Sequence, residues 1–119
     1  MEAIYDRNGD AIGWLDGDII YDTNDRYRAV VVDGDIYALA GQRYLGRFER
    51  GFVWDRNGLA VACTKDASGP PEIPQLARAP EPVPLDKPQD ATITNRATVP
   101  LNLSDRWSQR TWVRYLDGQ

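Results

Sequence analysis

Aspartates gather in the first 66 residues, at spacings that could hold a cation or supply a catalytic pair. The run Asp6-Arg7-Asn8-Gly9-Asp10 matches the start of an oxygen-ligand calcium loop, in which carboxylate and amide oxygens alternate. The match stops there, because Ala11 and Gly17 stand where such a loop needs Gly and a bidentate Glu. An Asn-Gly hairpin turn accounts for the same letters without a metal. We therefore expect no metal site and no cofactor.

Paired carboxylates are also the chemistry of glycoside hydrolysis. The acidic pairs that permit it are Asp16 with Asp18 and Asp33 with Asp35. They lie at expected turns, where solvated side chains are the rule. The chain contains no histidine, which excludes Ser-His-Asp and Cys-His nucleophilic sites and every histidine-containing zinc site. We therefore expect no catalytic residue, and we keep a carboxylate-based hydrolase acting on carbohydrate as the alternative function.

The net charge and the single cysteine restrict the classes of binding partner and the cellular compartment that we expect. A net charge of −4 argues against binding to nucleic acid or to an anionic membrane surface. Apolar runs such as 29–32 and 36–40 fall far short of the ~20 residues that span a bilayer. Cys63 cannot form an intramolecular disulfide, and its strand-like surroundings predict a buried, unreactive thiol. We expect a cytoplasmic protein.

Glycine and proline divide the chain into three parts. Nine of the ten glycines lie within residues 1–69, and all eight prolines lie within residues 70–100. Glycine punctuates hairpins, whereas clustered proline prevents both sheet and helix. The division predicts a β-domain over 1–66, an extended proline-rich arm over 67–90 and a separate C-terminal segment over 91–119.

The β-domain repeats itself about every 16 or 17 residues. Equivalent runs are Ile4-Tyr5-Asp6, Ile20-Tyr21-Asp22, Ile36-Tyr37-Ala38 and Val53-Trp54-Asp55. Each repeat has room for two short strands, and Asn8-Gly9 and Asn57-Gly58 favour type I′ turns between them. The pattern predicts an all-β meander of about eight short strands in four hairpin-like repeats, with pseudo-four-fold symmetry and a closed or nearly closed sheet.

Alternation along the strands assigns side chains to the two faces of the sheet. The expected interior consists of Ile4, Ile20, Ile36 and Val53 on the first strands and Trp14, Val31, Phe48 and Cys63 on the second. The opposite face carries one aromatic per repeat: Tyr5, Tyr21, Tyr37 and Trp54. An exposed ring of this kind would stack sugars or grip a proline-rich or aromatic peptide. The other interpretation is that the chain's own arm and tail cover it.

The C-terminal segment is too aromatic for a disordered tail. Trp107, Trp112 and Tyr115 are expected to dock, either on the β-domain or on a partner or second copy of the chain. Ser104 is placed to cap a short final helix with Trp107, Thr111 and Tyr115 on one face. Self-association through residues 91–119 is one form of such a partner contact.

These features resemble those of the four-fold β-flower proteins, a small bacterial family without a characterised activity. The resemblance covers nearly the whole chain and lies in Tyr5-Asp6-Arg7-Asn8-Gly9, its counterpart Trp54-Asp55-Arg56-Asn57-Gly58, the proline-rich stretch and the closing Trp107, Trp112 and Tyr115. It implies a four-fold arrangement of hairpins and brings no substrate. The function expected from the residues is a non-enzymatic binding or scaffolding module with an aromatic-lined face.

Overall fold

Eight short strands form a closed antiparallel barrel in the computed structural model, which describes residues 1–94, 96 and 99–118. In chain order they are β1 (Glu2–Tyr5), β2 (Ala11–Asp16), β3 (Ile19–Tyr21), β4 (Tyr27–Val32), β5 (Asp35–Ala38), β6 (Tyr44–Glu49), β7 (Phe52–Asp55) and β8 (Ala60–Cys63). Each strand pairs with the next, and β8 returns to β1 through the single pair Tyr5–Cys63. The predicted eight-strand meander is confirmed. We call the hairpins β1–β2, β3–β4, β5–β6 and β7–β8 units 1 to 4.

The loop inside each unit is built differently from the predicted type I′ turn. In unit 1, Asp6 and Asp10 close a three-residue loop in which only Gly9 has a positive φ, of 84°. Asp22 and Asp55 close units 2 and 4 in the same way, whereas Ala38 in unit 3 begins a loop one residue longer. The prediction of type I′ at Asn8-Gly9 and Asn57-Gly58 is therefore wrong. Both sites instead form the three-residue hairpin, with a left-handed residue last.

The barrel interior is lined by Ile4, Ile20, Ile36 and Val53, as predicted. Their cross-strand partners are all small: Gly13, Ala29, Gly46 and Ala62. Val31 and Phe48 also pack against this central cluster. Trp14 and Cys63 do not. Trp14 lies directly opposite Tyr21 on the outer face, and Cys63 belongs to an outer cluster with Phe52 and Trp54, so the prediction that they face inward is wrong.

The strand pairing is irregular within every unit. The register shifts in every unit, leaving one extra residue in the second strand. These extra residues are Ile12, Arg28, Leu45 and Val61. A β-bulge moves the following side chains by one position relative to the partner strand. Three of the four belong to the central cluster, where they meet the C-terminal helix.

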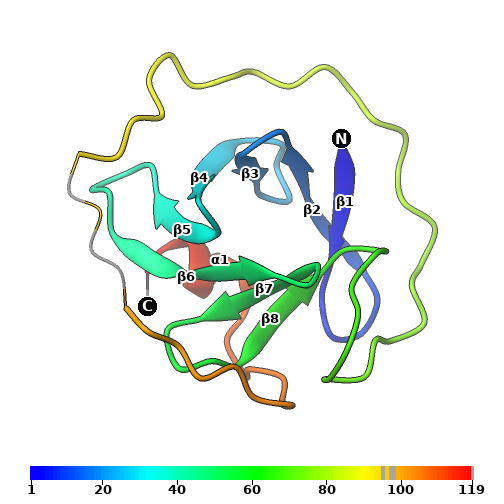
Figure 1. The fold of residues 1–119 in the computed structure, drawn as a ribbon. Coiled ribbons are helices and arrows are strands. Elements are labelled where there is room, and N and C mark those ends of the chain that lie inside the picture. The colour runs from blue at the N-terminus through cyan, green and yellow to red at the C-terminus, as the bar shows by residue number, and fades with distance from the viewer. Residues whose placement is uncertain (95, 97–98, 119) are drawn as a thin grey trace.

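The chain after β8 encircles the barrel. We call residues 67–107 the belt, and Figure 1 shows its described residues, 67–94, 96 and 99–107, running around the outside of the strands before the chain turns inward to the helix α1 (Trp112–Leu116). The Nε1 of Trp107 donates a hydrogen bond of 3.2 Å to the backbone oxygen of Glu72, so the two ends of the belt meet. Trp112, Tyr115 and Leu116 pack into the central cluster and close the barrel.

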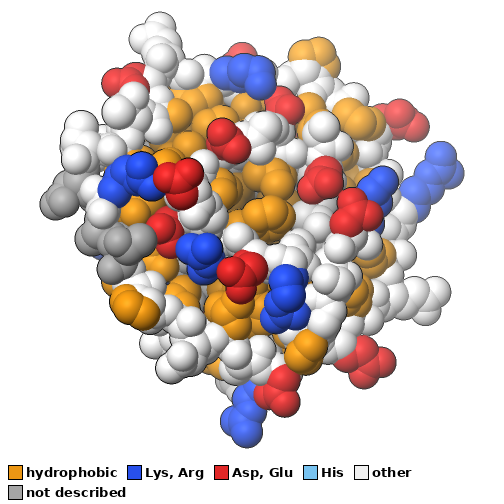
Figure 2. Space-filling view, viewed as in Figure 1, with side chains coloured by type: hydrophobic (Ala, Val, Ile, Leu, Met, Phe, Trp, Pro, Cys, Tyr) orange, Lys and Arg blue, Asp and Glu red, His pale blue; other side chains and the backbone are white. Residues whose placement is uncertain are grey.

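Ion pairs help to fasten the belt. Lys87 contacts Asp16 at 3.0 Å, and Arg96 contacts Asp33 at 2.6 Å. Figure 2 shows one face of the molecule, with hydrophobic side chains near its centre and side chains of both charges around them. In the described part of the chain, no helix is long and apolar enough to cross a membrane.

Candidate functional site

The four repeated aromatics lie on the outer face of the barrel, and all four are buried. Their exposed fractions are 6% for Tyr5, 0% for Tyr21, 1% for Tyr37 and 0% for Trp54. They therefore form no exposed ring in this structure, and their burial agrees with the interpretation in which the chain's own arm and tail cover them. Aromatics of this size would leave an apolar patch that monomeric proteins rarely expose. The belt and the C-terminal segment cover them.

Each aromatic is met by a different part of the belt. Leu76 and Leu103 pack against the outer cluster that contains Tyr5 and Trp54. Ile93 is buried in a separate cluster with Tyr37. Over unit 2 the contact is polar, because the hydroxyl of Tyr21 donates a hydrogen bond of 2.8 Å to the backbone oxygen of Asp86. Burial raises the pKa of this hydroxyl, with smaller effects from nearby charges.

Units 1 and 4 receive the belt through the same backbone contact. The backbone N–H of Ala77 donates to the oxygen of Gly9 at 2.9 Å, and that of Ser104 donates to Gly58 at 2.9 Å. Only glycine permits this approach. A Cβ on Gly9 would lie 2.0 Å from the oxygen of Gln75, and one on Gly58 would lie 2.1 Å from the corresponding belt oxygen. Two equivalent loops thus hold two equivalent tripeptides, Gln75-Leu76-Ala77 and Asn102-Leu103-Ser104.

In unit 3 the belt is held by a side chain, that of Gln42, in place of a loop backbone oxygen. The amide nitrogen of Gln42 donates to the oxygen of Thr92 at 3.1 Å, and its amide oxygen accepts from the N–H of Thr94 at 3.0 Å. The tripeptide held here is Thr92-Ile93-Thr94. In all three units the N–H that is bound follows a buried or half-buried Leu or Ile. The barrel therefore holds three segments of its own chain, each with a central aliphatic residue, through their main-chain groups.

Aspartate side chains stiffen the loops that receive the belt. The Asp6 carboxylate accepts from the N–H groups of Asn8 and Asp10, and Asp55 does the same at 2.8 and 3.0 Å with the corresponding residues of unit 4. The residues that resemble a calcium loop, 6–10, are therefore explained by hydrogen bonds within the hairpin loop. Among the described residues, no group of three or more acidic or thiol side chains is placed to hold a metal ion.

The C-terminal aromatics lie on the β-domain of the same chain. Trp112 and Tyr115 are buried and stack at 5.8 Å, and the Tyr115 hydroxyl donates to the oxygen of Trp54 at 3.0 Å. Trp107 lies edge-on to Phe52 at 5.9 Å. The final helix begins at Trp112 with Thr111 as its N-cap, so the predicted start at Ser104 is wrong. Ser104 instead accepts from the N–H of Arg106 in a local turn.

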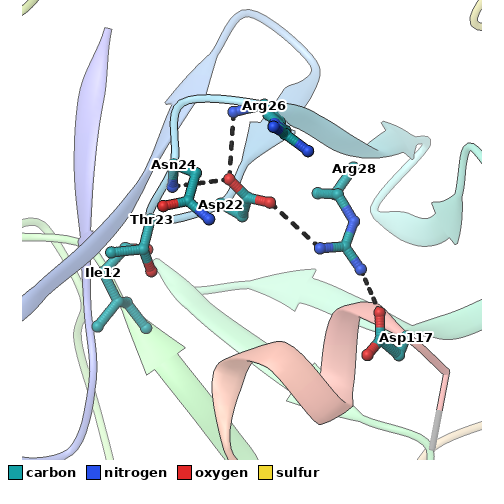
Figure 3. Close-up of polar contacts among 7 residues, drawn as sticks. All are labelled: Ile12, Asp22, Thr23, Asn24, Arg26, Arg28 and Asp117. Atoms are coloured by element: carbon teal, nitrogen blue, oxygen red, sulfur yellow. Dashed lines mark hydrogen bonds and ion pairs between the residues drawn. The ribbon is translucent and has the colours of Figure 1, made fainter.

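Arginines fasten this helix to the loops (Figure 3). Arg28, the extra residue of unit 2, bridges the carboxylates of Asp22 and Asp117, with 3.2 Å to Asp22. Arg110 pairs with the buried carboxylate of Asp55 at 3.2 Å. Because Asp22 and Asp55 also hold their own loops, each links a hairpin loop to the segment that closes the barrel.

The four carboxylates of the alternative hydrolase do not form a common site of free acids. Asp16 and Asp33 pair with belt cations, and the buried Asp35 pairs with Arg47 at 3.1 Å. Asp18 is exposed at the turn between β2 and β3. Cys63 is a buried free thiol, and burial raises its pKa to about 11.

Sequence reasoning missed the residues that hold the belt, namely Gly9, Gln42 and Gly58. The signal that was available is the likeness of Gln75-Leu76-Ala77 to Asn102-Leu103-Ser104, each an amide, a leucine and a small residue. The likeness is too short to stand out until the structure places both tripeptides on equivalent loops.

A closed barrel of four hairpins, encircled and closed by its own C-terminal half, defines an all-β protein of pseudo-four-fold symmetry. The model of one family, the 4-fold beta flower proteins, matches residues 2–116. The chain belongs to this family, as the resemblance predicted. No curated protein and no solved structure matches the chain.

Proposed function

We propose that the protein is a non-enzymatic binding or scaffolding module that holds extended polypeptide segments against the outer face of its barrel. The observation that carries the proposal is that units 1, 3 and 4 each hold a belt tripeptide by equivalent hydrogen bonds to its main-chain groups. We call each of these binding positions, and the corresponding position on unit 2, a seat. Main-chain hydrogen bonds give such a surface affinity for any extended segment, and an aliphatic pocket beside an aromatic gives selectivity. In this structure the segments belong to the chain itself.

In this proposal the repeated aromatics line the binding positions. Tyr5, Tyr37 and Trp54 share clusters with Leu or Ile side chains of the belt, so a segment from another chain would meet the same surface. We place the module in the cytoplasm, where a free thiol such as Cys63 stays reduced. No observation favours the carbohydrate hydrolase over this function.

The test is to turn the belt into a separable ligand. A specific protease site is inserted between Pro82 and Val83, both of which are exposed. Cleavage leaves the barrel and a C-terminal piece that carries Ile93 and Leu103. We expect the pieces to stay associated in gel filtration and an added labelled C-terminal piece to exchange into the complex.

A matched pair of labelled pieces separates binding of the belt from binding of α1 alone. Leu103→Ser removes a docked aliphatic side chain, whereas Val99→Ser changes a belt valine that is 45% exposed. We expect the Leu103→Ser piece to compete about tenfold more weakly than the Val99→Ser piece, the effect of losing one anchor residue. Equal competition by the two pieces would refute the proposal, as would failure of the cleaved pieces to reassociate.

A further inference from the structure

Unit 2 is the exception among the four seats. No backbone bond joins the belt to its loop among the described residues; the belt is held instead by the Tyr21 hydroxyl on Asp86 and by Lys87 on Asp16, at the opposite end of the hairpin from the loop. Its loop is left uncovered, and residues 23–27 are all exposed, whereas Gly9 and Gly58 in the equivalent loops are buried beneath the belt. Three seats are therefore filled and one is open.

The open loop has the same conformation as the filled ones. Asp25 has a φ of 62°, in the left-handed region that Gly9 and Gly58 occupy, and its N–H closes the loop on Asp22 at 3.1 Å. The Asp22 carboxylate accepts from the N–H groups of Asn24 and Arg26 (Figure 3). The backbone oxygen of Asp25, which corresponds to the bound oxygens of Gly9 and Gly58, has no partner in the described part of the chain.

An aromatic platform and a groove adjoin this oxygen. Tyr27 occupies the place of Ala11 in unit 1 and Ala60 in unit 4, and it is 42% exposed. A groove of about 640 Å³ runs from Tyr27 past Leu39 to the belt. The groove is lined by two acids, Asp86 and Asp90, and by two cations, Arg28 and Lys87. Both cations already pair with aspartates of the chain, whereas no lysine or arginine among the described residues pairs with Asp86 or Asp90.

We propose that the open seat of unit 2 binds an extended peptide of a partner protein, in which an aliphatic residue is followed by a small residue and then a basic one. The inference rests on the proposed function. The N–H after the aliphatic residue pairs with the Asp25 oxygen, as Ala77 and Ser104 pair with theirs. The aliphatic side chain packs on Tyr27, and the basic side chain lies near Asp86 and Asp90.

The occupant is a partner because the chain's own seating segments are already in use. Leu76, Ile93 and Leu103 are each placed in another unit. The belt segment nearest to the open loop is held at the far end of unit 2 by Lys87. Because Arg28 and Lys87 are already paired within the chain, the unpaired Asp86 and Asp90 favour a cationic peptide over an acidic one.

The test uses the full-length protein and a labelled peptide with the sequence of residues 73–78, Ile-Pro-Gln-Leu-Ala-Arg, as the probe. We expect saturable binding by fluorescence anisotropy, with backbone amide shifts in NMR spectra confined to residues 23–28 and 39–40. Replacing Leu by Ser in the peptide abolishes binding, and replacing Arg by Gln weakens it and removes most of its salt dependence.

Two exposed positions give matched protein variants. Tyr27→Ser removes the platform, whereas Val113→Ser changes a side chain that is 56% exposed on α1. We expect Tyr27→Ser to weaken binding at least about tenfold and Val113→Ser to leave it unchanged. Absence of saturation up to about 1 mM peptide would overturn the inference, and so would equal affinity of the two variants. Shifts confined to the Gly9 loop would also overturn it, because they would show displacement of the belt, while supporting the proposed function.

Discussion

Two buried tryptophans differ in a single hydrogen bond, and this difference yields a sharp prediction for Trp→Phe substitutions. The Nε1 of Trp54 donates to the oxygen of Glu49 at 3.1 Å, whereas the Nε1 of Trp112 is buried without an acceptor in the described part of the chain. The exposed fractions are 0% and 7%, so the smaller ring leaves a comparable void at both positions. That void costs about 1.5 kcal/mol in each case.

The polar terms then have opposite signs. Trp54→Phe also loses a hydrogen bond, worth about 1 kcal/mol, for a total loss of about 2.5 kcal/mol. Trp112→Phe removes an unpaired buried donor, which returns about 1 kcal/mol and leaves a loss of about 0.5 kcal/mol. The expected difference of about 2 kcal/mol corresponds to about 8 °C in Tm for a domain of this size.

Circular dichroism at far-ultraviolet wavelengths is the appropriate assay, because both substitutions alter tryptophan fluorescence. Thermal and urea transitions of the wild type and the two variants are compared at one protein concentration. Equal midpoints for Trp54→Phe and Trp112→Phe, or a lower one for Trp112→Phe, would refute the reasoning about the unpaired donor.

Three further predictions concern the belt, the buried acids and the tail. Gly58→Ala places a Cβ 2.1 Å from the belt's backbone and should cost more than about 3 kcal/mol in urea unfolding, whereas Gly17→Ala, with nothing within 4 Å, should cost about 1 kcal/mol; equal losses would contradict the close packing of the belt. Burial raises the pKa of Cys63 from 9.0 to about 11 and that of Tyr44 from 10.0 to about 12. The unfolded chain therefore loses these protons at lower pH than the folded chain, and the free energy of unfolding followed by CD should fall as the pH rises from 9 to 12. A free energy of unfolding that stays constant over this range would contradict the prediction. Ending the chain at Gly69 uncovers the outer aromatics and should lower Tm markedly or cause aggregation seen by light scattering, and a soluble fragment with the full-length Tm would show that the tail is a separate element.

The repeat pattern was sufficient to predict the barrel. Ile4 and its three counterparts recur with the period of a two-strand unit, and alternation places them inside. The sequence did not reveal the bulges, because an extra residue such as Ile12 or Leu45 looks like any other strand residue. Trp14 was aligned with Val31 and Phe48 of the other repeats, although the pairing makes the next residue, Leu15, their interior counterpart.

The candidate site was harder to predict than the fold. The period identified the outer aromatics, but their burial depends on where a proline-rich segment with no regular structure runs, and no local propensity determines that path. Gly9 and Gly58 were correctly recognised as turn residues. Their second role, to let the belt approach within hydrogen-bond distance, depends on contacts more than 40 residues away in the chain.

The bond between Trp107 and Glu72, which joins the two ends of the belt, can form only after residue 107 has been synthesised. The four hairpins leave the ribosome earlier and can pair at once, whereas the residues that close the ring and the helix that fills the barrel emerge after them. A nascent or prematurely terminated chain therefore presents a barrel with bare aromatic flanks, the kind of surface that chaperones and proteases recognise. That surface is concealed only once synthesis has passed α1, so burial of the outer aromatics reports that the belt has been made and docked.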